Sequence, residues 1–174
     1  MPNKFLFLDI DGVLNHQDWY HKTWERRKKQ EVVYPYSEFD PECVERVNRI
    51  LKETGAKLVV SSSWRDDIYL SDIFKEVGLP TEFDKTIGFF ASSQLGFKTR
   101  GQEINYYLTK GSDCINKNIR YAILDDDNDF TNEQKLSSLF RTAASPCDEP
   151  YEKNEGTGLT EKLTNKIIDY LNIK

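Results

Sequence analysis

The first residues of this chain that could do chemistry together are two carboxylates near its N-terminus. Asp9 and Asp11 are separated by one residue and followed by Gly12. Two acids at this spacing can divide the work of a group transfer, because one can attack or bind a metal while the other donates or accepts a proton. Gly12 allows a sharp turn and a close approach of a ligand to the backbone. An Asp-Gly pair can also be a simple turn, so this stretch alone leaves both interpretations open.

Other polar clusters could complete a site with these acids. Serines occupy positions 61–63 and aspartates occupy positions 125–127. Carboxylates that lie together cannot all stay ionised without a compensating cation, and oxygen ligands of this kind suit Mg²⁺. Lys98 or Arg100 could neutralise a phosphate at such a site. The plainer alternatives are a solvated acidic turn, a chain reversal at the serines and a solvated lysine.

Each of these clusters follows a mainly apolar segment with the length of a strand. These segments lie at 5–8, 57–60 and 119–124. Short apolar runs of this kind are typical of strands that are buried on both faces of a parallel sheet. The carboxyl ends of parallel strands share one edge, where ligands bind in open α/β folds. We therefore predict an α/β fold with a mainly parallel sheet and with all of the polar clusters at one edge.

Helical patterns separate the predicted strands. The clearest helix begins at Asp40, a suitable N-cap, with Pro41 at its first position, and ends at Gly55. Strand, helix and strand in this order predict a right-handed βαβ unit. The other expected elements are helices over 68–77 and 101–109, a less regular strand region over 83–90, a strand within 136–142, a loop over 143–158 and a C-terminal helix with apolar positions 163, 167, 168 and 171.

Size and composition indicate one folded domain over residues 1–174. The chain carries 29 acidic and 24 basic residues, a net charge of −5 that argues against bulk, non-specific nucleic-acid binding but allows a local basic groove. No apolar run approaches membrane-spanning length, and the N-terminus is too short for a signal peptide. Cys43, Cys114 and Cys147 are odd in number and far apart, which favours a reducing compartment. We expect a cytoplasmic protein without membrane association or an obligate protein partner.

Residues 15–37 form an excursion between the first strand and the first helix. Part of it is basic and interleaved with aromatic residues. Lys22 and Arg26 could contact phosphates, and Trp24 could stack on a base. The alternative is a surface helix whose tryptophans pack on the core.

Together these stretches resemble the haloacid dehalogenase (HAD) superfamily of phosphohydrolases. The resemblance rests on the sequence Asp-Ile-Asp-Gly-Val-Leu at 9–14, a serine after the second strand, a basic residue and a strand that runs into Asp-Asp, all in the order of the family's four motifs. It covers Phe5 to about Phe130. Residues 61–65, 100–104, 123–127 and 158–160 more narrowly resemble the small HAD domains of RNA-repair proteins, which are similar to the phosphatase half of polynucleotide kinase-phosphatase. The resemblance implies a three-layer Rossmann-like core with a small or absent cap.

The resemblance also implies a mechanism. Asp9 would be the nucleophile that forms an aspartyl-phosphate, and Asp11 would be the general acid and then the general base. Mg²⁺ would be held by the Asp9 carboxylate, the main-chain carbonyl of Asp11 and an acid from Asp125 or Asp126.

The family's remaining positions have competing matches in this chain. Ser61 is the best match for the Ser/Thr position, with Ser62 and Ser63 as alternatives. Lys98 is our choice for the family's lysine, with Arg100 as a competitor. We also expect Gly12, Ser62 and Arg65 to contact the substrate.

A small cap implies an open site, which favours a large or end-presented substrate. A nucleic-acid 3′-phosphate, on DNA or RNA, is the substrate that the resemblance favours. The alternatives are a small phosphate ester such as a nucleotide, or a non-catalytic binding module on the same scaffold. No Gly-x-x-x-x-Gly-Lys-Ser/Thr loop is present, so the chain carries no kinase part of that type.

Overall fold

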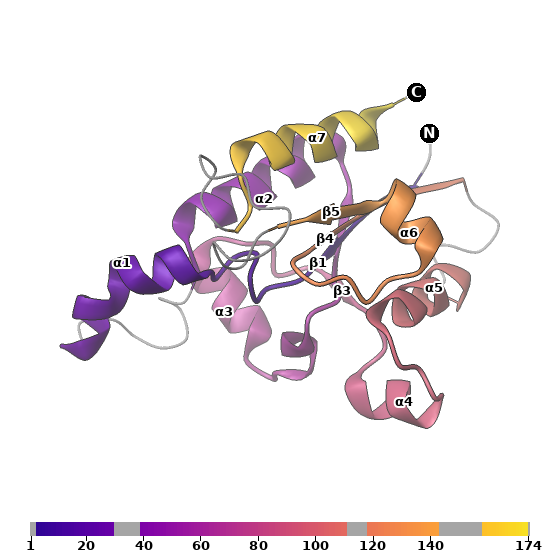
Figure 1. Ribbon diagram of the computed structural model, residues 1–174, viewed down its shortest axis with the longest axis horizontal. Coiled ribbons are helices and arrows are strands. Elements are labelled where there is room, and N and C mark those ends of the chain that lie inside the picture. The colour runs from indigo at the N-terminus through magenta and orange to yellow at the C-terminus, as the bar shows by residue number, and fades with distance from the viewer. Residues whose placement is uncertain (1–2, 30–38, 111–117, 143–157, 174) are drawn as a thin grey trace.

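A five-stranded, all-parallel sheet forms the centre of the computed structural model, which describes residues 3–29, 39–110, 118–142 and 158–173 (Figure 1). The strand order is β3-β2-β1-β4-β5. The strands are β1 (Asn3–Leu8), β2 (Lys57–Val60), β3 (Asp84–Lys85), β4 (Ile119–Asp125) and β5 (Leu139–Arg141). The prediction of an α/β fold with a parallel sheet is confirmed.

Helices occupy the connections and cover both faces of the sheet. They are α1 (Gln17–Lys28), α2 (Pro41–Thr54), the 3₁₀ helix η2 (Ser63–Asp66), α3 (Leu70–Val77), α4 (Phe89–Gln94), α5 (Arg100–Lys110), α6 (Asn132–Ser137) and α7 (Glu161–Asn172). Helices α2 and α7 lie side by side over one face, and α5 lies on the other side of the sheet (Figure 1). The result is the three-layer, Rossmann-like arrangement that the sequence predicts.

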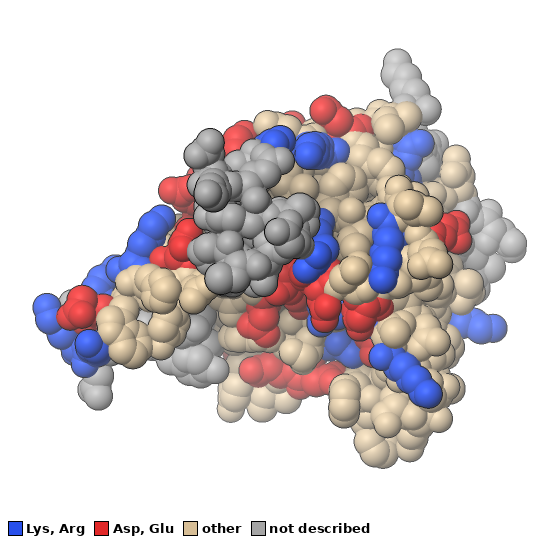
Figure 2. Space-filling view, viewed as in Figure 1, with Lys and Arg blue, Asp and Glu red and all other residues tan. Residues whose placement is uncertain are grey.

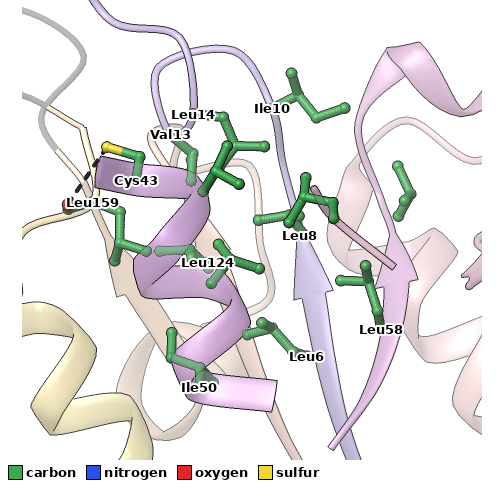
Figure 3. Packing of buried hydrophobic residues seen from close by; sticks show 14 of the residues in the cluster. Leu6, Leu8, Ile10, Val13, Leu14, Cys43, Ile50, Leu58, Leu124 and Leu159 are labelled. Carbon is green, nitrogen blue, oxygen red and sulfur yellow. Dashed lines mark hydrogen bonds between the residues drawn. The ribbon is translucent and has the colours of Figure 1, made fainter. Parts of the chain in front are cut away.

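Alternate residues of β1 point to opposite faces and enter two separate cores. Leu6 and Leu8 pack in the core under α2 and α7, where Ile50 also lies (Figure 3). Phe5 and Phe7 pack on the opposite face with residues of α5. Both faces of the strand are therefore buried, which explains why its sequence is a continuous apolar run and not an alternating one.

The order of the strands creates a crevice at the carboxyl ends of β1 and β4. The chain passes outward from β1 to β2 and β3, and then returns to β4 on the other side of β1. Connections that leave a sheet in opposite directions open a ligand-binding crevice at this point. The register aligns the strand ends: the Asp9 amide donates to the Leu124 carbonyl (2.9 Å), and the Ser61 amide donates to the Leu8 carbonyl (3.0 Å).

Helix α2 has the ends that its sequence predicts. The Asp40 carboxylate accepts a hydrogen bond from the Glu42 amide (2.9 Å), and Pro41 occupies the first helical position. Gly55 ends the helix with φ of 67°, and its amide donates to the Leu51 carbonyl (2.9 Å). The left-handed conformation at this position favours glycine.

One predicted strand region is corrected. The region 83–90 holds only the two-residue strand β3, and Phe89 and Phe90 lie on α4 with their side chains largely exposed. The strand predicted within 136–142 is confirmed as β5, although the first residues of that region belong to α6. A capping box of Thr131 and Gln134 begins α6 and is visible in the sequence. The apolar Phe89 and Phe90 face solvent on α4, so they do not form the buried strand that their sequence predicts.

Some of the predicted segments lie partly or wholly outside the residues that the structure describes. Helix α1, within the predicted excursion, projects away from the sheet (Figure 1). No helix among the described residues is long and apolar enough to cross a membrane. The rest of the excursion at 30–37, the loop at 143–157, Cys114 and Cys147 lie outside the described residues.

Candidate active site

Three carboxylates converge at the crevice between β1 and β4. Asp9 follows β1, Asp125 ends β4 and Asp126 comes next. One ligand oxygen from each lies within 4.8 Å of the others, and Asp9 and Asp125 are buried. Oxygen ligands packed together at the end of two strands fit a hard divalent cation such as Mg²⁺. The sequence predicts this grouping, and the register of β1 on β4 produces it.

Burial makes these carboxylates costly to ionise. Burial raises the pKa of Asp9, although Arg100 and a hydrogen bond from the Ser62 hydroxyl act against that rise. Burial and the charge of Asp9 raise the pKa of Asp125 to about 7 and that of Asp126 to about 6. Accumulated negative charge of this kind is relieved by a bound cation.

We expect the stability of the metal-free protein to fall as the pH rises. The pKa values of Asp125 (about 7) and Asp126 (about 6) lie above the value of about 3.9 for an aspartate in an unfolded chain. The folded state therefore binds more protons than the unfolded state. Protonation of Asp125 and Asp126 stabilises the fold fully below about pH 4, and this stabilisation is lost as the pH rises through 6 and 7. Mg²⁺ should raise the unfolding temperature more at about pH 8 than at about pH 5.5, because protons compete with the metal.

Thermal unfolding in EDTA and in excess Mg²⁺, at both pH values, measures this effect. Asp126→Asn is the matched control and should flatten the pH dependence in EDTA. An equal Mg²⁺ shift at both pH values in the unmodified protein would contradict the linkage.

Asp11 lies beside the cluster and is held by two neutral donors. Asn15 Nδ2 donates to Asp11 Oδ1 (2.7 Å), and Trp64 Nε1 donates to Asp11 Oδ2 (3.0 Å). The Asp11 carboxylate is exposed, unlike that of Asp9, and it is not one of the three converging groups. Trp64 comes from η2, so the segment after β2 fixes the direction of a carboxylate that follows β1. No sequence pattern predicts this role of Trp64.

Arg100, and not Lys98, reaches the acids. Arg100 Nη1 lies 3.1 Å from Asp9 Oδ1 and also bonds Asp125 Oδ2. Although burial disfavours its charge, Asp125 and Asp9 raise the pKa of Arg100 above its ordinary value. The Lys98 side chain is exposed, and its ammonium group has no ion pair with a described residue. The positively charged side chain that contacts these acids is therefore Arg100, the first residue of α5.

A close contact at the start of α5 holds Arg100 in place. Asp129 Oδ2 accepts a hydrogen bond from the Arg100 amide (3.0 Å). A Cβ at Gly101 would lie 2.5 Å from the side chain of Gln134 and 2.9 Å from the backbone of Phe130. Only glycine leaves room for this contact, so Gly101 lets the start of α5 approach the segment after β4.

The serines after β2 have different surroundings. The Ser62 hydroxyl hydrogen-bonds to Asp9 and accepts the Trp64 amide (3.4 Å) as the N-cap of η2. Ser61 is fully buried, and its Oγ has no hydrogen-bond partner within the described part of the chain. Ser63 is exposed. Of the serines that match the family position, Ser62 is the one whose hydroxyl contacts the predicted nucleophile.

The sequence predicts substrate contacts for Arg65 and Gly12. In the structure both residues form hydrogen bonds with other residues of the chain. Arg65 is buried; its Nη1 donates to the carbonyls of Ser61 and Ser62 (both 2.9 Å), and its Nη2 bonds both carboxylate oxygens of Glu103 (3.1 and 3.0 Å). The Gly12 amide donates to the Asn15 carbonyl (2.8 Å), with φ of 74° at Gly12. Arg65 thus shapes the serine loop, and Gly12 shapes the loop of the two aspartates.

The basic-aromatic residues of α1 lie apart from the acids. Lys22, Trp24 and Arg26 are exposed on this projecting helix (Figure 1). Trp24 lies against Tyr20, with ring centroids 5.4 Å apart, and Lys28 Nζ lies 5.0 Å from the Trp24 ring centroid. Trp24 is 41% exposed, whereas Trp19 on the same helix is half-buried, so the alternative of a surface helix whose tryptophans pack on the core stays open for Trp19. Basic side chains cluster on the arm of the surface that α1 forms (Figure 2).

A second group of possible ligands, His16, Asp40 and Cys43, is explained by hydrogen bonds. The Trp19 amide donates to His16 Nδ1 (3.3 Å), which leaves the ring proton on Nε2 to bond Asp40 (2.9 Å). The imidazole then offers no lone pair to a metal. Burial raises the pKa of the Cys43 thiol to about 11, and this thiol donates to the Leu159 carbonyl (3.6 Å; Figure 3). These contacts fasten the segments before α1 and α7 to α2.

Comparison with known proteins agrees with the geometry. The sequence model of the family described as "HAD domain in Swiss Army Knife RNA repair proteins" matches residues 5–146, which include each of the clustered acids and Arg100. No curated protein and no solved structure matches the chain. The match supports a HAD-type phosphohydrolase, and the HAD family typically uses a divalent metal. The chain belongs to the family of HAD domains found in Swiss Army Knife RNA repair proteins.

Proposed function

We propose that this protein is a Mg²⁺-dependent phosphomonoesterase that works through an aspartyl-phosphate and removes 3′-phosphates from nucleic-acid ends. The observation that carries the chemistry is the convergence of Asp9, Asp125 and Asp126 beside the guanidinium of Arg100. The nucleic-acid substrate rests on the family and on the open, basic-aromatic α1. Family membership alone does not specify a substrate.

The reaction divides between Asp9 and Asp11. A carboxylate oxygen of Asp9 attacks phosphorus while the bond to the leaving oxygen breaks, and Asp11 gives that oxygen its proton. Asp11 then takes a proton from a water that attacks the same phosphorus, and the bond to Asp9 breaks to give inorganic phosphate and the free carboxylate. Trp64 and Asn15 keep the Asp11 carboxylate pointing one way throughout.

The other groups bind the charge of the phosphate. Asp9, Asp125 and Asp126 would hold Mg²⁺, which when bound would offset the repulsion between Asp9 and the phosphate. The Arg100 guanidinium, already 3.1 Å from Asp9, is placed to bind a phosphate oxygen as well. The Ser62 hydroxyl contacts Asp9 and can transfer its hydrogen bond to the phosphate.

Ser62→Ala should lower kcat for a small aryl phosphate by about 10²-fold, the cost of one donor to a transition-state oxygen. Ser61→Ala should have a much smaller effect, because the Ser61 hydroxyl has no partner among the described residues. Steady-state kinetics of both variants, with thermal unfolding to verify their folding, measures the difference. A large loss in Ser61→Ala with none in Ser62→Ala would instead place the family's serine at Ser61.

The surroundings of the site favour a substrate that is presented by its end. Helix α1 is the one element inserted between β1 and α2 within the described residues, and it projects away from the sheet (Figure 1). An open crevice accepts the end of a polymer. The exposed Tyr20 and Trp24 rings, with Lys28 above Trp24, resemble the stacking and cationic groups that bind single strands.

A panel of 3′- and 5′-phosphorylated DNA and RNA oligonucleotides and mononucleotides tests the substrate. We expect the highest kcat/KM with a 3′-phosphorylated oligonucleotide, and loss of turnover in EDTA that Mg²⁺ restores. Turnover of mononucleotides without turnover of 3′-phosphorylated oligonucleotides would instead indicate a small-molecule phosphatase. Absence of turnover of any ester, including a chromogenic aryl phosphate, would indicate a non-catalytic binding module.

A further inference from the structure

We propose that a groove beside Arg100, between α4 and the start of α5, binds the nucleobase of the nucleotide that carries the phosphate. The groove has a volume of about 330 Å³ and is lined in part by Phe89, Phe97, Lys98, Arg100 and Asp129. That volume is at the lower end of the range for sites that hold one small molecule. The inference rests on the proposed function, because it assigns the place of the leaving group in that reaction.

The groove begins where the phosphate must lie. Arg100 lines it, and Arg100 Nη1 is 3.1 Å from the predicted nucleophile Asp9. A phosphate attacked by Asp9 therefore lies beside Arg100, and the nucleoside attached to it is only one ester bond away. The groove is the hollow that this nucleoside would meet on the α5 side of the site.

The walls of the groove suit a flat aromatic ligand. Phe89 is 73% exposed, although burying a phenylalanine ring is favourable. Phe97 packs against Tyr106, with ring centroids 5.5 Å apart, so one wall of the groove is held in place. An aromatic ring that is exposed next to a phosphate site is a stacking surface for a base, and every base has a flat face.

Hydrogen bonds hold α4 against the site, so the stacking surface is built in advance. The Phe89 amide donates to Asp66 Oδ2 (2.9 Å) in η2. A Cβ at Gly88 would lie 2.9 Å from Asp66 Oδ1, so the start of α4 lies close to the Asp66 side chain. Ser92 Oγ donates to Glu103 Oε1 (2.6 Å), and Glu103 also bonds the buried Arg65. The segment after β2, α4 and α5 are thus connected through one buried network.

Charge at the groove also fits a nucleotide. The Lys98 ammonium is exposed at the groove and has no ion pair with a described residue, so it can approach the next phosphate of a chain. A protein partner would be expected also to cover Phe90 and Leu95, which are exposed on α4 and at its end. The region that α4 occupies forms a mostly uncharged lobe, bordered by charged side chains toward the middle of the face shown (Figures 1 and 2). The exposed ring of Phe89, the ammonium group of Lys98 and the neighbouring phosphate site together favour a nucleobase over a protein partner as the ligand of this groove.

The test compares Phe89→Ala with Phe90→Ala. Both residues lie on α4 and are similarly exposed, at 73% and 76%, but Phe90 does not line the groove. Each variant is assayed with a 3′-phosphorylated oligonucleotide, with the same oligonucleotide lacking its terminal base, and with a chromogenic aryl phosphate. Phe89→Ala should raise KM about tenfold for the complete oligonucleotide, as expected for the loss of one stacked base.

The same variant should leave turnover of the abasic oligonucleotide unchanged, and Phe89→Trp should restore the low KM. Equal kinetics of Phe89→Ala and the unmodified protein on the complete oligonucleotide would overturn the inference while leaving the phosphatase function in place. Equal losses in Phe89→Ala and Phe90→Ala would also overturn it, in favour of a broad apolar contact. An unmodified protein that hydrolyses none of the esters would instead disprove the proposed function itself.

Discussion

Asp9→Asn should abolish turnover of phosphate monoesters, with a loss of at least about 10³-fold in kcat. An amide cannot attack phosphorus as a carboxylate does, and Asp9 is the buried acid that both Arg100 and the Ser62 hydroxyl approach. The fold should survive, because asparagine has the shape of aspartate. The substitution also removes one of the charges that repel one another at Asp9, Asp125 and Asp126.

Acid quenching of a reaction with a ³²P-labelled ester separates loss of the nucleophile from loss of binding. The unmodified protein should retain label in an acid-stable, hydroxylamine-sensitive form, as expected for an acyl phosphate, and Asp9→Asn should retain none. Asp11→Asn is the matched control, because it removes the proton donor while leaving the nucleophile in place. Comparable steady-state activity in Asp9→Asn would rule out the aspartyl-phosphate mechanism.

Arg100→Ala should lower kcat/KM for a small aryl phosphate by about 10²- to 10³-fold, while Lys98→Ala should leave it within about twofold. Arg100 Nη1 contacts Asp9 and Asp125, so the guanidinium sits where charge changes during the reaction. Lys98 is exposed and forms no ion pair with the described residues. The comparison is matched, because both substitutions remove one positive charge from neighbouring positions at the start of α5.

Steady-state kinetics in saturating Mg²⁺, together with thermal unfolding, measures this difference. Arg100→Ala also leaves Asp9 and Asp125 without their positive neighbour, so its unfolding temperature should fall in EDTA and recover in Mg²⁺. Arg100→Lys should restore part of the activity, because a lysine keeps the charge without the two-pronged geometry. A larger loss in Lys98→Ala than in Arg100→Ala would transfer the role of the family's lysine back to Lys98.

Much of the fold could be predicted from the sequence because its signals are local. The strands β1, β2 and β4 are mainly apolar and end in apolar or acidic residues at the site, and α2 carries its N-cap, its first-turn proline and its terminal glycine. The errors arose where apolar residues face solvent. A strand is predicted at Phe89 and Phe90 only if their side chains are assumed to be buried, and they are exposed on α4. Leu136 is likewise 89% exposed, on a helix that begins with a capping box.

The candidate site was predictable to the extent that strands deliver its residues. Asp9 and Asp125 end apolar runs, and parallel strands must bring their carboxyl ends to one edge. Residues delivered by helices and turns were not predictable in this way. Trp64 donates to Asp11 and Glu103 holds Arg65, and both contacts join residues 38 or more positions apart in the chain.

The sequence by itself determined that Asp9, which follows the first strand, meets Asp125 and Asp126 at the end of β4, because strand periodicity and a parallel sheet suffice for that result. Only the tertiary structure decided which of two residues close together in the sequence reaches the site. Lys98 and Arg100 are separated by one residue, but the contact at Gly101 that positions the start of α5 directs Arg100 to the acids. Ser61 and Ser62 are adjacent, but successive side chains in an extended segment point in opposite directions, and only the packing of η2 shows that Ser62 reaches Asp9.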